Sequence, residues 1–483
     1  MNFEKFYNTY LQEGNNSKDE FHETINVLPF TSNPSASNFD SSCGLKGITG
    51  EFFRKCSFQE IKPIADYKKD ASGPVIDYMS LRKSLLGNSL NFFQEIMDDI
   101  MSAKGEFVPF DASFLKYMAV DTIEKKGKKA ESKYGNGQKK IAEYLVSMLN
   151  GENFPQRTNS NNNLFSKTIR KALDAGSFYN MNRLEISYKI LPFVQKTFRD
   201  DLIWLMEKED YVLIKYIDLF LYFYACYSIT QSAMMLDAEN KKYADLNTPE
   251  PLYFILDKEV ASAKRDVVTK GWATKLPNEY LERLYGRMQA LDIANTLLSN
   301  DYNPEATGFY PEVLQKMKKT PFEDVKEDCE KLLEYYKTRK LEILNKRENR
   351  KAIDLSMLVD LTVNSYEEFL SKLEKLCRVL QATDYCSKMR RRMVDLMQVR
   401  FLQTRRGRGH TVLTLDDEML IFLIAMITKE KRSKLKDVFK SFRNYGIYFD
   451  LHTCQAIEDY LSKLNLLERR SDSGEAKYVR IVL

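Results

Sequence analysis

Apolar residues recur at three- and four-residue intervals along most of the chain, which is the spacing of an amphipathic helix. The pattern runs through residues 78–101 and through nearly all of 164–405. Residues 320–350 continue it as a long charged helix of about three heptads, with Arg339 interrupting the apolar seam. Such a seam packs against a neighbouring antiparallel helix, or against a partner chain as a coiled coil. The chain is therefore predicted to be mainly α, with a multi-helical body over 164–405.

The most apolar stretch, residues 203–229, raises the question of a membrane span. Lys208, Asp210, Lys215 and Asp218 interrupt it. No uninterrupted apolar run then reaches the ~18–20 residues that cross a bilayer. We expect a helix buried within the bundle, and no membrane partner.

Residues 1–150 are predicted to form a small mixed N-terminal region, because polar stretches alternate there with short apolar runs. Within it, residues 125–140 (KKGKKAESKYGNGQKK) hold seven lysines and three glycines. This composition is typical of a mobile basic loop, either a solvated linker or a phosphate-contacting loop. It is not a Walker A loop, since GxxxxGK[ST] occurs nowhere in the chain.

Residues 411–483 carry the clearest local signals. Thr414 is expected to cap a first helix from residue 415, Ser433 a second over 434–445, and Asp450 a third. Gly446 suits the end of the second helix. Strand-like residues 466–470 and 476–483 flank a polar turn. Three helices and a closing hairpin are the order of a winged helix, with the third helix as recognition helix and 471–475 as wing tip.

Positive charge is concentrated in the last fifth of the chain. The whole chain has net charge +5, but residues 386–483 contain 20 Lys+Arg and 12 Asp+Glu, which is +8. The other 385 residues therefore sum to −3. A local positive field favours a polyanion, and double-stranded DNA is the first candidate.

Two basic groups are candidate phosphate contacts, because the arginine fork matches phosphate geometry. One group precedes the predicted winged helix and the other lies on its wing strands: Lys388, Arg390, Arg391, Arg392, Arg405, Arg406 and Arg408, then Arg469, Arg470, Lys477 and Arg480. For the first group, a solvated hinge before the winged helix is the main alternative to a phosphate contact, and a contact to an acidic protein is the other.

The predicted third helix is less basic than a DNA-reading helix. Its exposed face is expected to carry Thr453, Gln455, Glu458, Asp459 and Lys463. Winged helices also dock proteins, so we assign Glu458 and Asp459 to partner binding. Carboxylates also read cytosine edges, and DNA readout by this helix stays open.

Little in the composition favours catalysis. Seven cysteines lack any CxxC, and three histidines lack metal-ligand spacing. One nuclease-like set exists, Asp111 with Glu124 and Lys126, in which two carboxylates would hold a divalent ion. The ExK pattern is degenerate, so we expect a non-enzyme without cofactor. Residues 1–13 lack the apolar core of a leader, which indicates a cytoplasmic protein.

Three C-terminal segments carry a family resemblance: 407–410 (GRGH), 446–450 (GIYFD) and 464–479 (LNLLERRSDSGEAKYV). Together they resemble the DptG family, the middle component of the DptFGH restriction machinery that accompanies DNA phosphorothioation. The likeness is sharpest over about the last 75 residues. It implies a bacterial antiviral defence complex that attacks DNA lacking the sulfur modification, beside ATPase-like and helicase-like partners. A non-catalytic subunit contacting DNA and partners is thus expected; a metal-dependent nuclease and a structural adaptor that never touches DNA are the alternatives.

Overall fold

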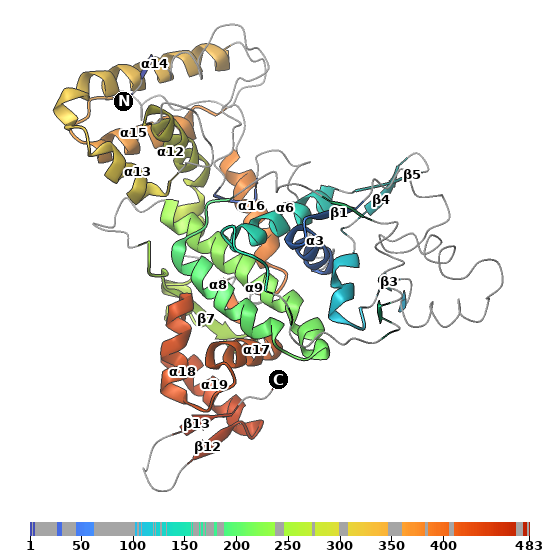
Figure 1. The fold of residues 1–483 in the computed structure, drawn as a ribbon. Helices are drawn as coiled ribbons and strands as arrows, with labels where there is room; N and C mark the ends of the chain where they lie inside the picture. Colours follow the sequence, from blue (N-terminus) through green and yellow to red (C-terminus); the bar gives the residue numbers. More distant parts are fainter. Residues whose placement is uncertain are drawn as a thin grey trace.

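The computed structural model is mainly helical (Figure 1). It describes residues 1, 3–4, 27–30, 45–61, most of 102–157, parts of 164–170, 178–180, 188–236, 246–272, 276–298, 308–345, 360–381, 385–404, 410–469, 477–480 and 483. The predicted helix at 78–101 lies outside the described residues. The body helices are α3 (Lys46–Cys56), α6 (Lys133–Ser147), α8 (Pro192–Met206), α9 (Asp210–Leu236), α12 (Leu284–Leu298), α13 (Tyr310–Met317), α14 (Lys326–Asn345), α15 (Tyr366–Val379) and α16 (Tyr385–Met397). The mainly α, multi-helical prediction is confirmed.

Helix α9 is the centre of the body. Its long, apolar sequence meets the length and composition of a membrane span, yet most of its side chains are buried inside the protein. α3, α6 and α8 pack against it, and Figure 1 shows it between the upper helices and the C-terminal unit. The prediction of a buried core helix is confirmed.

The charged helix is shorter than predicted. A 3-10 turn, η6 (Phe322–Asp324), precedes α14. α14 packs on α15, a neighbouring helix of the same chain, which is the first of the two arrangements that the sequence allows. The apolar seam shifts after Tyr336. Lys340 and Leu344, at steps of four, are buried in place of Arg339. The ammonium group of Lys340 lies 5.9 Å from the Tyr336 ring centroid, which offsets part of its burial.

Short strands occur within residues 164–405, where nearly everything is predicted to be helical. β7 (Leu252–Leu256) lies in a four-stranded sheet of order β11-β7-β9-β8, with β8 (Leu402–Thr404), β9 (Thr411–Leu415) and β11 (Ile447–Tyr448). It is parallel to both β9 and β11. A buried apolar run of five residues cannot be distinguished from helix by periodicity, which is why the helical prediction fails here.

The N-terminal region is mixed, as predicted, but its basic loop is not a loop. Residues 125–140 include the end of β4 (Thr122–Lys125), then β5 (Lys128–Glu131), and the first half of α6. β4 and β5 form an antiparallel hairpin. Shorter elements are β1 (Gln59–Ile61), which pairs with β6 (Phe178–Asn180), β2 (Ser102–Ala103), which pairs with β3 (Glu106–Phe107), and the 3-10 helix η3 (Ala112–Tyr117). The sequence does not indicate this hairpin, because its lysine-rich strands lack the alternation of apolar and polar residues that is typical of a strand.

The three C-terminal helices and the hairpin occur in the predicted order. They are α17 (Asp417–Thr428), β10 (Ser433–Lys434), α18 (Leu435–Phe442), η8 (Arg443–Tyr445), β11, α19 (Leu451–Lys463), β12 (Leu467–Arg469) and β13 (Lys477–Val479). We call residues 416–480 the C-terminal unit. Its three-stranded sheet has the order β10-β13-β12.

Two of the predicted helix caps are wrong and one is right. Thr414 lies in β9, and Asp416 caps α17 instead by accepting a hydrogen bond from the Met419 amide at 2.8 Å. Ser433 lies in β10, so α18 starts without a side-chain cap. Asp450 caps α19 as predicted, accepting from the Thr453 amide at 2.9 Å.

Candidate nucleic-acid interface

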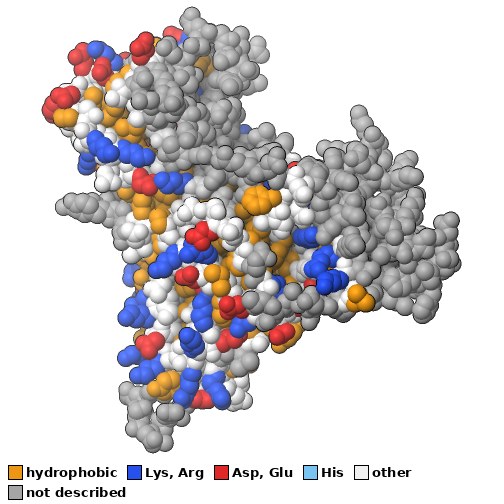
Figure 2. All heavy atoms as spheres, in the orientation of Figure 1, with side chains coloured by type: hydrophobic (Ala, Val, Ile, Leu, Met, Phe, Trp, Pro, Cys, Tyr) orange, Lys and Arg blue, Asp and Glu red, His pale blue; other side chains and the backbone are white. Residues whose placement is uncertain are grey.

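Helix α18 presents a row of cations that the sequence analysis did not select. Residues 431–443 contain six Lys or Arg and one acid, Asp437. Leu435, Val438 and Phe442 are buried, which turns the opposite side of the helix outward. Lys436, Lys440 and the following Arg443 stand there, all exposed. Figure 2 shows Lys and Arg side chains gathered over the lower part of the molecule, where Figure 1 places α18 and its neighbours.

The strand before α18 is fixed by one arginine. The Arg432 guanidinium lies 4.4 Å from the Tyr478 ring centroid and 2.7 Å from Glu468. Lys434 pairs with Tyr478 across the β10–β13 ladder. These contacts hold Lys431 and Lys434 at the edge of the sheet with their side chains exposed.

The predicted wing contacts are partly neutralised within the unit. Lys477 forms an ion pair with Glu458 of α19. Arg480 lies 2.8 Å from Glu468. The side chain of Arg469 and all of Arg470 lie outside the described residues. Two of the four predicted phosphate contacts are thus held by carboxylates, which compete with phosphate for them.

The upstream basic group is divided by burial. Arg390 and Arg391 are exposed on α16, whereas Arg392 is buried, with Asp395 3.8 Å away. Burial is also the main reason that the pKa of Arg392 falls below its ordinary value. Lys388 is half-buried. Arg405, Arg406 and Arg408 lie outside the described residues.

The two basic groups are not brought together. α16 packs against α9, α12 and the π-helical turn η4 (Leu276–Leu281). In Figure 1 it lies beside the upper part of α9, while α18 lies beyond β7 at the lower end. The upstream group and the wing, with β12 and β13 at the lower end of the molecule in Figure 1, therefore lie in two separate places.

The first turn of α19 is locked to the body by Arg265. This guanidinium donates to both carboxylate oxygens of Asp450, at 2.7 and 2.8 Å, and to the Thr453 hydroxyl at 2.7 Å. Glu259 lies 2.9 Å from the same group. We call these four residues the α19 clamp. Thr453 was expected on the exposed face, but it is fully buried because it belongs to the clamp.

Charge compensation within the clamp shifts the pKa values of Asp450 and Arg265. Burial alone would raise the pKa of Asp450, but the hydrogen bonds from Arg265 and Thr453 outweigh it and lower that pKa below its ordinary value. Hydrogen bonds to Asp450 likewise raise the pKa of Arg265, against the effect of its burial. Both shifts favour the ion pair.

The exposed face of α19 carries one acid, Asp459, and one lysine, Lys463. Asp459 is exposed and accepts a hydrogen bond from Gln455 at 3.0 Å. Glu458, its predicted partner in docking, is turned toward Lys477. The structure therefore does not present the two carboxylates as one free pair.

A buried network joins the C-terminal unit to α8. Asp201 is 1% exposed and accepts hydrogen bonds from the hydroxyls of Tyr224 at 2.6 Å and Tyr445 at 2.8 Å. The ammonium group of Lys429, which follows α17 in the left-handed conformation, pairs with the same carboxylate. Burial raises the pKa of Asp201, although these partners oppose the rise.

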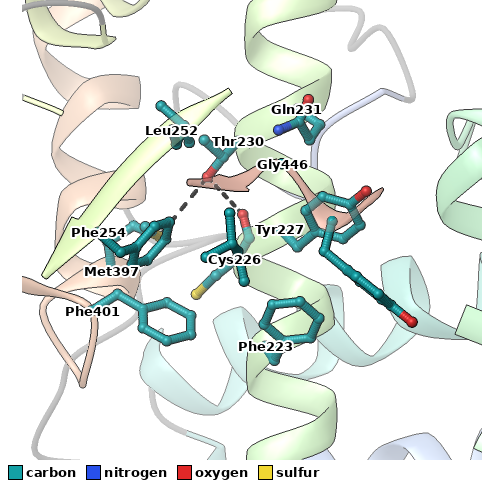
Figure 3. A pocket seen from close by; sticks show the side chains of 12 residues that line it. Phe223, Cys226, Tyr227, Thr230, Gln231, Leu252, Phe254, Met397, Phe401 and Gly446 are labelled. Carbon is teal, nitrogen blue, oxygen red and sulfur yellow. Dashed lines mark hydrogen bonds between the residues drawn. The ribbon is translucent and has the colours of Figure 1, made fainter. Parts of the chain in front are cut away.

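An apolar cavity lies where α9 meets the four-stranded sheet (Figure 3). Phe223, Phe254 and Phe401 line it, and the Thr230 hydroxyl is satisfied by the Cys226 carbonyl at 2.6 Å. Its volume of about 20 Å³ holds about one water molecule. It is a packing gap between body and sheet, too small for a cofactor or substrate.

The nuclease-like set is only partly described. Asp111 caps η3 by accepting from the Ser113 amide at 2.8 Å, so its carboxylate already has a structural task. The side chain of Glu124 and all of Lys126 lie outside the described residues. In the part of the chain that the structure describes, no group of three or more His, Cys, Asp or Glu is placed to hold a metal ion.

The chain matches no model of a known protein family and no curated protein.

Proposed function

We propose that the protein is a non-catalytic subunit of a bacterial restriction complex, which contacts DNA and docks partner subunits. The target would be DNA that lacks the phosphorothioate modification. The resemblance of residues 407–479 to the DptG family supports the setting. The order of helices and strands in the C-terminal unit supports a winged helix as the DNA-contacting part.

One observation carries the DNA contact: residues 431–443 are strongly basic and largely exposed. Phosphate neutralisation supplies most of the affinity of non-specific DNA binding, so exposed cations are the feature that matters. Their opposite face is anchored in the core by α18 and η8. A patch held in this way presents its charge in one orientation.

Partner docking has a weaker basis in the structure. Asp459 remains exposed on α19, but Glu458 is paired within the chain. An ATPase-like or helicase-like partner with a basic surface fits this face, since opposite charges set orientation and association rate. Pull-down with the proteins encoded beside this one tests it: Asp459→Lys should weaken assembly and leave duplex affinity equal or higher.

The decisive experiment is duplex binding by the full chain. Fluorescence anisotropy with a labelled duplex is measured between 50 and 200 mM salt. The plot of log affinity against log salt should fall with a slope near −0.9 for each phosphate neutralised. A chain that binds no duplex at the lower salt is the structural adaptor, and the DNA-contact proposal then fails.

Non-catalysis is tested separately. The purified chain is incubated with plasmid, Mg²⁺ or Mn²⁺, and ATP, and we expect no nicking. Nicking that disappears in Glu124→Gln would establish the nuclease alternative instead.

A further inference from the structure

We infer that a duplex binds along α18, through a row formed by Lys436, Lys440 and Arg443, and that this contact is independent of DNA sequence. The inference rests on the proposed function and deepens it. It places the DNA contact on α18, and not on α19, the helix in the position of a recognition helix.

The geometry of the row follows from helical spacing. Lys436, Lys440 and Arg443 stand at positions i, i+4 and i+7, which share one face of a helix. The first two are about 6 Å apart along the axis, since the rise is about 1.5 Å per residue. Lys431 and Lys434 continue the positive surface toward β10. Cations spaced along one exposed line suit the regular charges of a phosphate backbone.

The lysines are available for phosphate. Within the described part of the chain, neither Lys436 nor Lys440 has a carboxylate within ion-pair distance. By contrast, Lys477 and Arg480 on the wing are held by Glu458 and Glu468. An anion approaching α18 therefore displaces no internal partner. Asp437 is the one acid in residues 431–443, and it weakens the field locally.

Helix α19 is poorly placed to read bases. A helix-turn-helix recognition helix contacts base edges with residues near its N-terminus. In this chain the first turn of α19 carries Asp450 and Thr453, and both are held by Arg265 of the body. Thr453 is buried. Leu451 and His452 stay exposed in that turn, but the row of cations lies on α18, and contacts from lysine and arginine to phosphates carry no sequence information directly.

Salt-dependent binding of the full chain tests the row directly. Lys436→Gln with Lys440→Gln removes two cations, so the salt slope should become shallower by about 1.8. Between 50 and 200 mM salt, a fourfold change, the wild type should therefore lose about 12-fold more affinity than the variant. Arg443 is kept, because its guanidinium also stacks 5.6 Å from the Tyr448 ring centroid.

A matched control makes the same charge change elsewhere. Lys316 and Lys319 are exposed near the end of α13, in the upper group of helices. Lys316→Gln with Lys319→Gln should leave the slope unchanged. Asp437→Asn removes the acid from residues 431–443, so it should tighten duplex binding. Unfolding midpoints of all variants should match the wild type, since each side chain is exposed.

The outcomes separate this inference from the function it rests on. If the wild type binds no duplex, the proposed function fails. If the wild type binds but the Lys436 and Lys440 variant keeps the full slope, the α18 row is wrong while DNA binding stands. Duplexes of unrelated sequence should bind with equal affinity; a preference that Gln455→Ala abolishes would return the reading role to α19.

Discussion

Removing the Arg265 guanidinium should release the first turn of α19 from the body. In the wild type, Asp450 and Glu259 have side chains about one-tenth exposed, and Arg265 is the cation that both contact. Arg265→Met keeps the approximate length of the side chain but leaves the carboxylates of Asp450 and Glu259 without the guanidinium group. Stranding one partner of a buried ion pair costs about 3–5 kcal/mol, and we expect a loss of that size in the free energy of unfolding.

The partner substitution has a smaller predicted effect. Asp450→Asn keeps an oxygen that caps α19, since Asn is as good an N-cap as Asp. It loses the charge-assisted part of the hydrogen bonds, about 1.5–3 kcal/mol. Because the two residues touch, the double variant should be less destabilised than the sum of the singles. Asp459→Asn, on the exposed face of α19, is the control and should change stability by less than about 0.5 kcal/mol.

Urea unfolding measures the total free energy, and amide hydrogen exchange locates the loss. In Arg265→Met the amides of α19 should lose protection before those of α9, because local opening precedes global unfolding. A loss below about 1 kcal/mol with unchanged protection of α19 would refute the clamp as the feature that holds this helix.

The clamp also predicts an acid limit. The pKa of Asp450 is lowered in the folded chain, so its contribution to stability is present above its ordinary pKa of about 3.9. That contribution is lost as the pH falls from there through the lowered value. Protection of α19 should therefore decrease below about pH 4. In Arg265→Met this decrease should be absent; if it persists, another carboxylate is responsible.

Three further variants probe neighbouring features. Gly446 has φ +67°, and a Cβ there would lie 2.7 Å from the Glu250 carbonyl oxygen, so Gly446→Ala should cost at least about 1–2 kcal/mol in thermal unfolding. Burial raises the pKa of Asp201, so its contribution to stability should fall as the pH rises through that pKa; a calorimetric pH series should show this dependence lost in Asp201→Asn. Arg390→Ala with Arg391→Ala should weaken the binding of a long duplex at low salt, leave that of a short duplex unchanged and keep the unfolding midpoint, because both side chains are exposed on a surface separate from α18.

Local sequence signals were sufficient for features that depend on neighbours in the chain. The apolar content of 203–229 predicts a buried helix; residues 203–206 are the end of α8, and from Asp210 the stretch is the buried helix α9. Asp450 was recognised as a cap because an acid before an amphipathic run accepts from the first turn. The burial of Arg392 is not part of the sequence prediction, although the sequence contains the signal for it. Arg392 follows Met389 by three residues and therefore lies on the buried side of α16, unlike Arg390 and Arg391.

Features that depend on distant residues could not be predicted. Arg265 and Asp450 are 185 residues apart, and nothing in either local sequence indicates the other. The strand β7 is defined by its pairing with β9 and β11, from segments well over a hundred residues away. The α18 row was visible at i, i+4 and i+7. The sequence prediction follows the three consecutive arginines of α16, 390–392, although residues 431–443 hold more Lys and Arg per residue, and a run of charge does not reveal exposure.

The C-terminal unit is joined to the body at three separate places: β11 pairs with β7, Arg265 holds the start of α19, and Asp201 receives Lys429 and Tyr445. A flexible tether needs exposed, weakly packed connections, whereas two of these attachments contain buried charges whose separation costs several kcal/mol. The unit therefore keeps one orientation relative to α16. A duplex on α18 would be held at a fixed angle to the exposed arginines of that helix. Both basic surfaces can then engage one DNA molecule only if the duplex follows the protein between them, and a short duplex should depend on the α18 row alone.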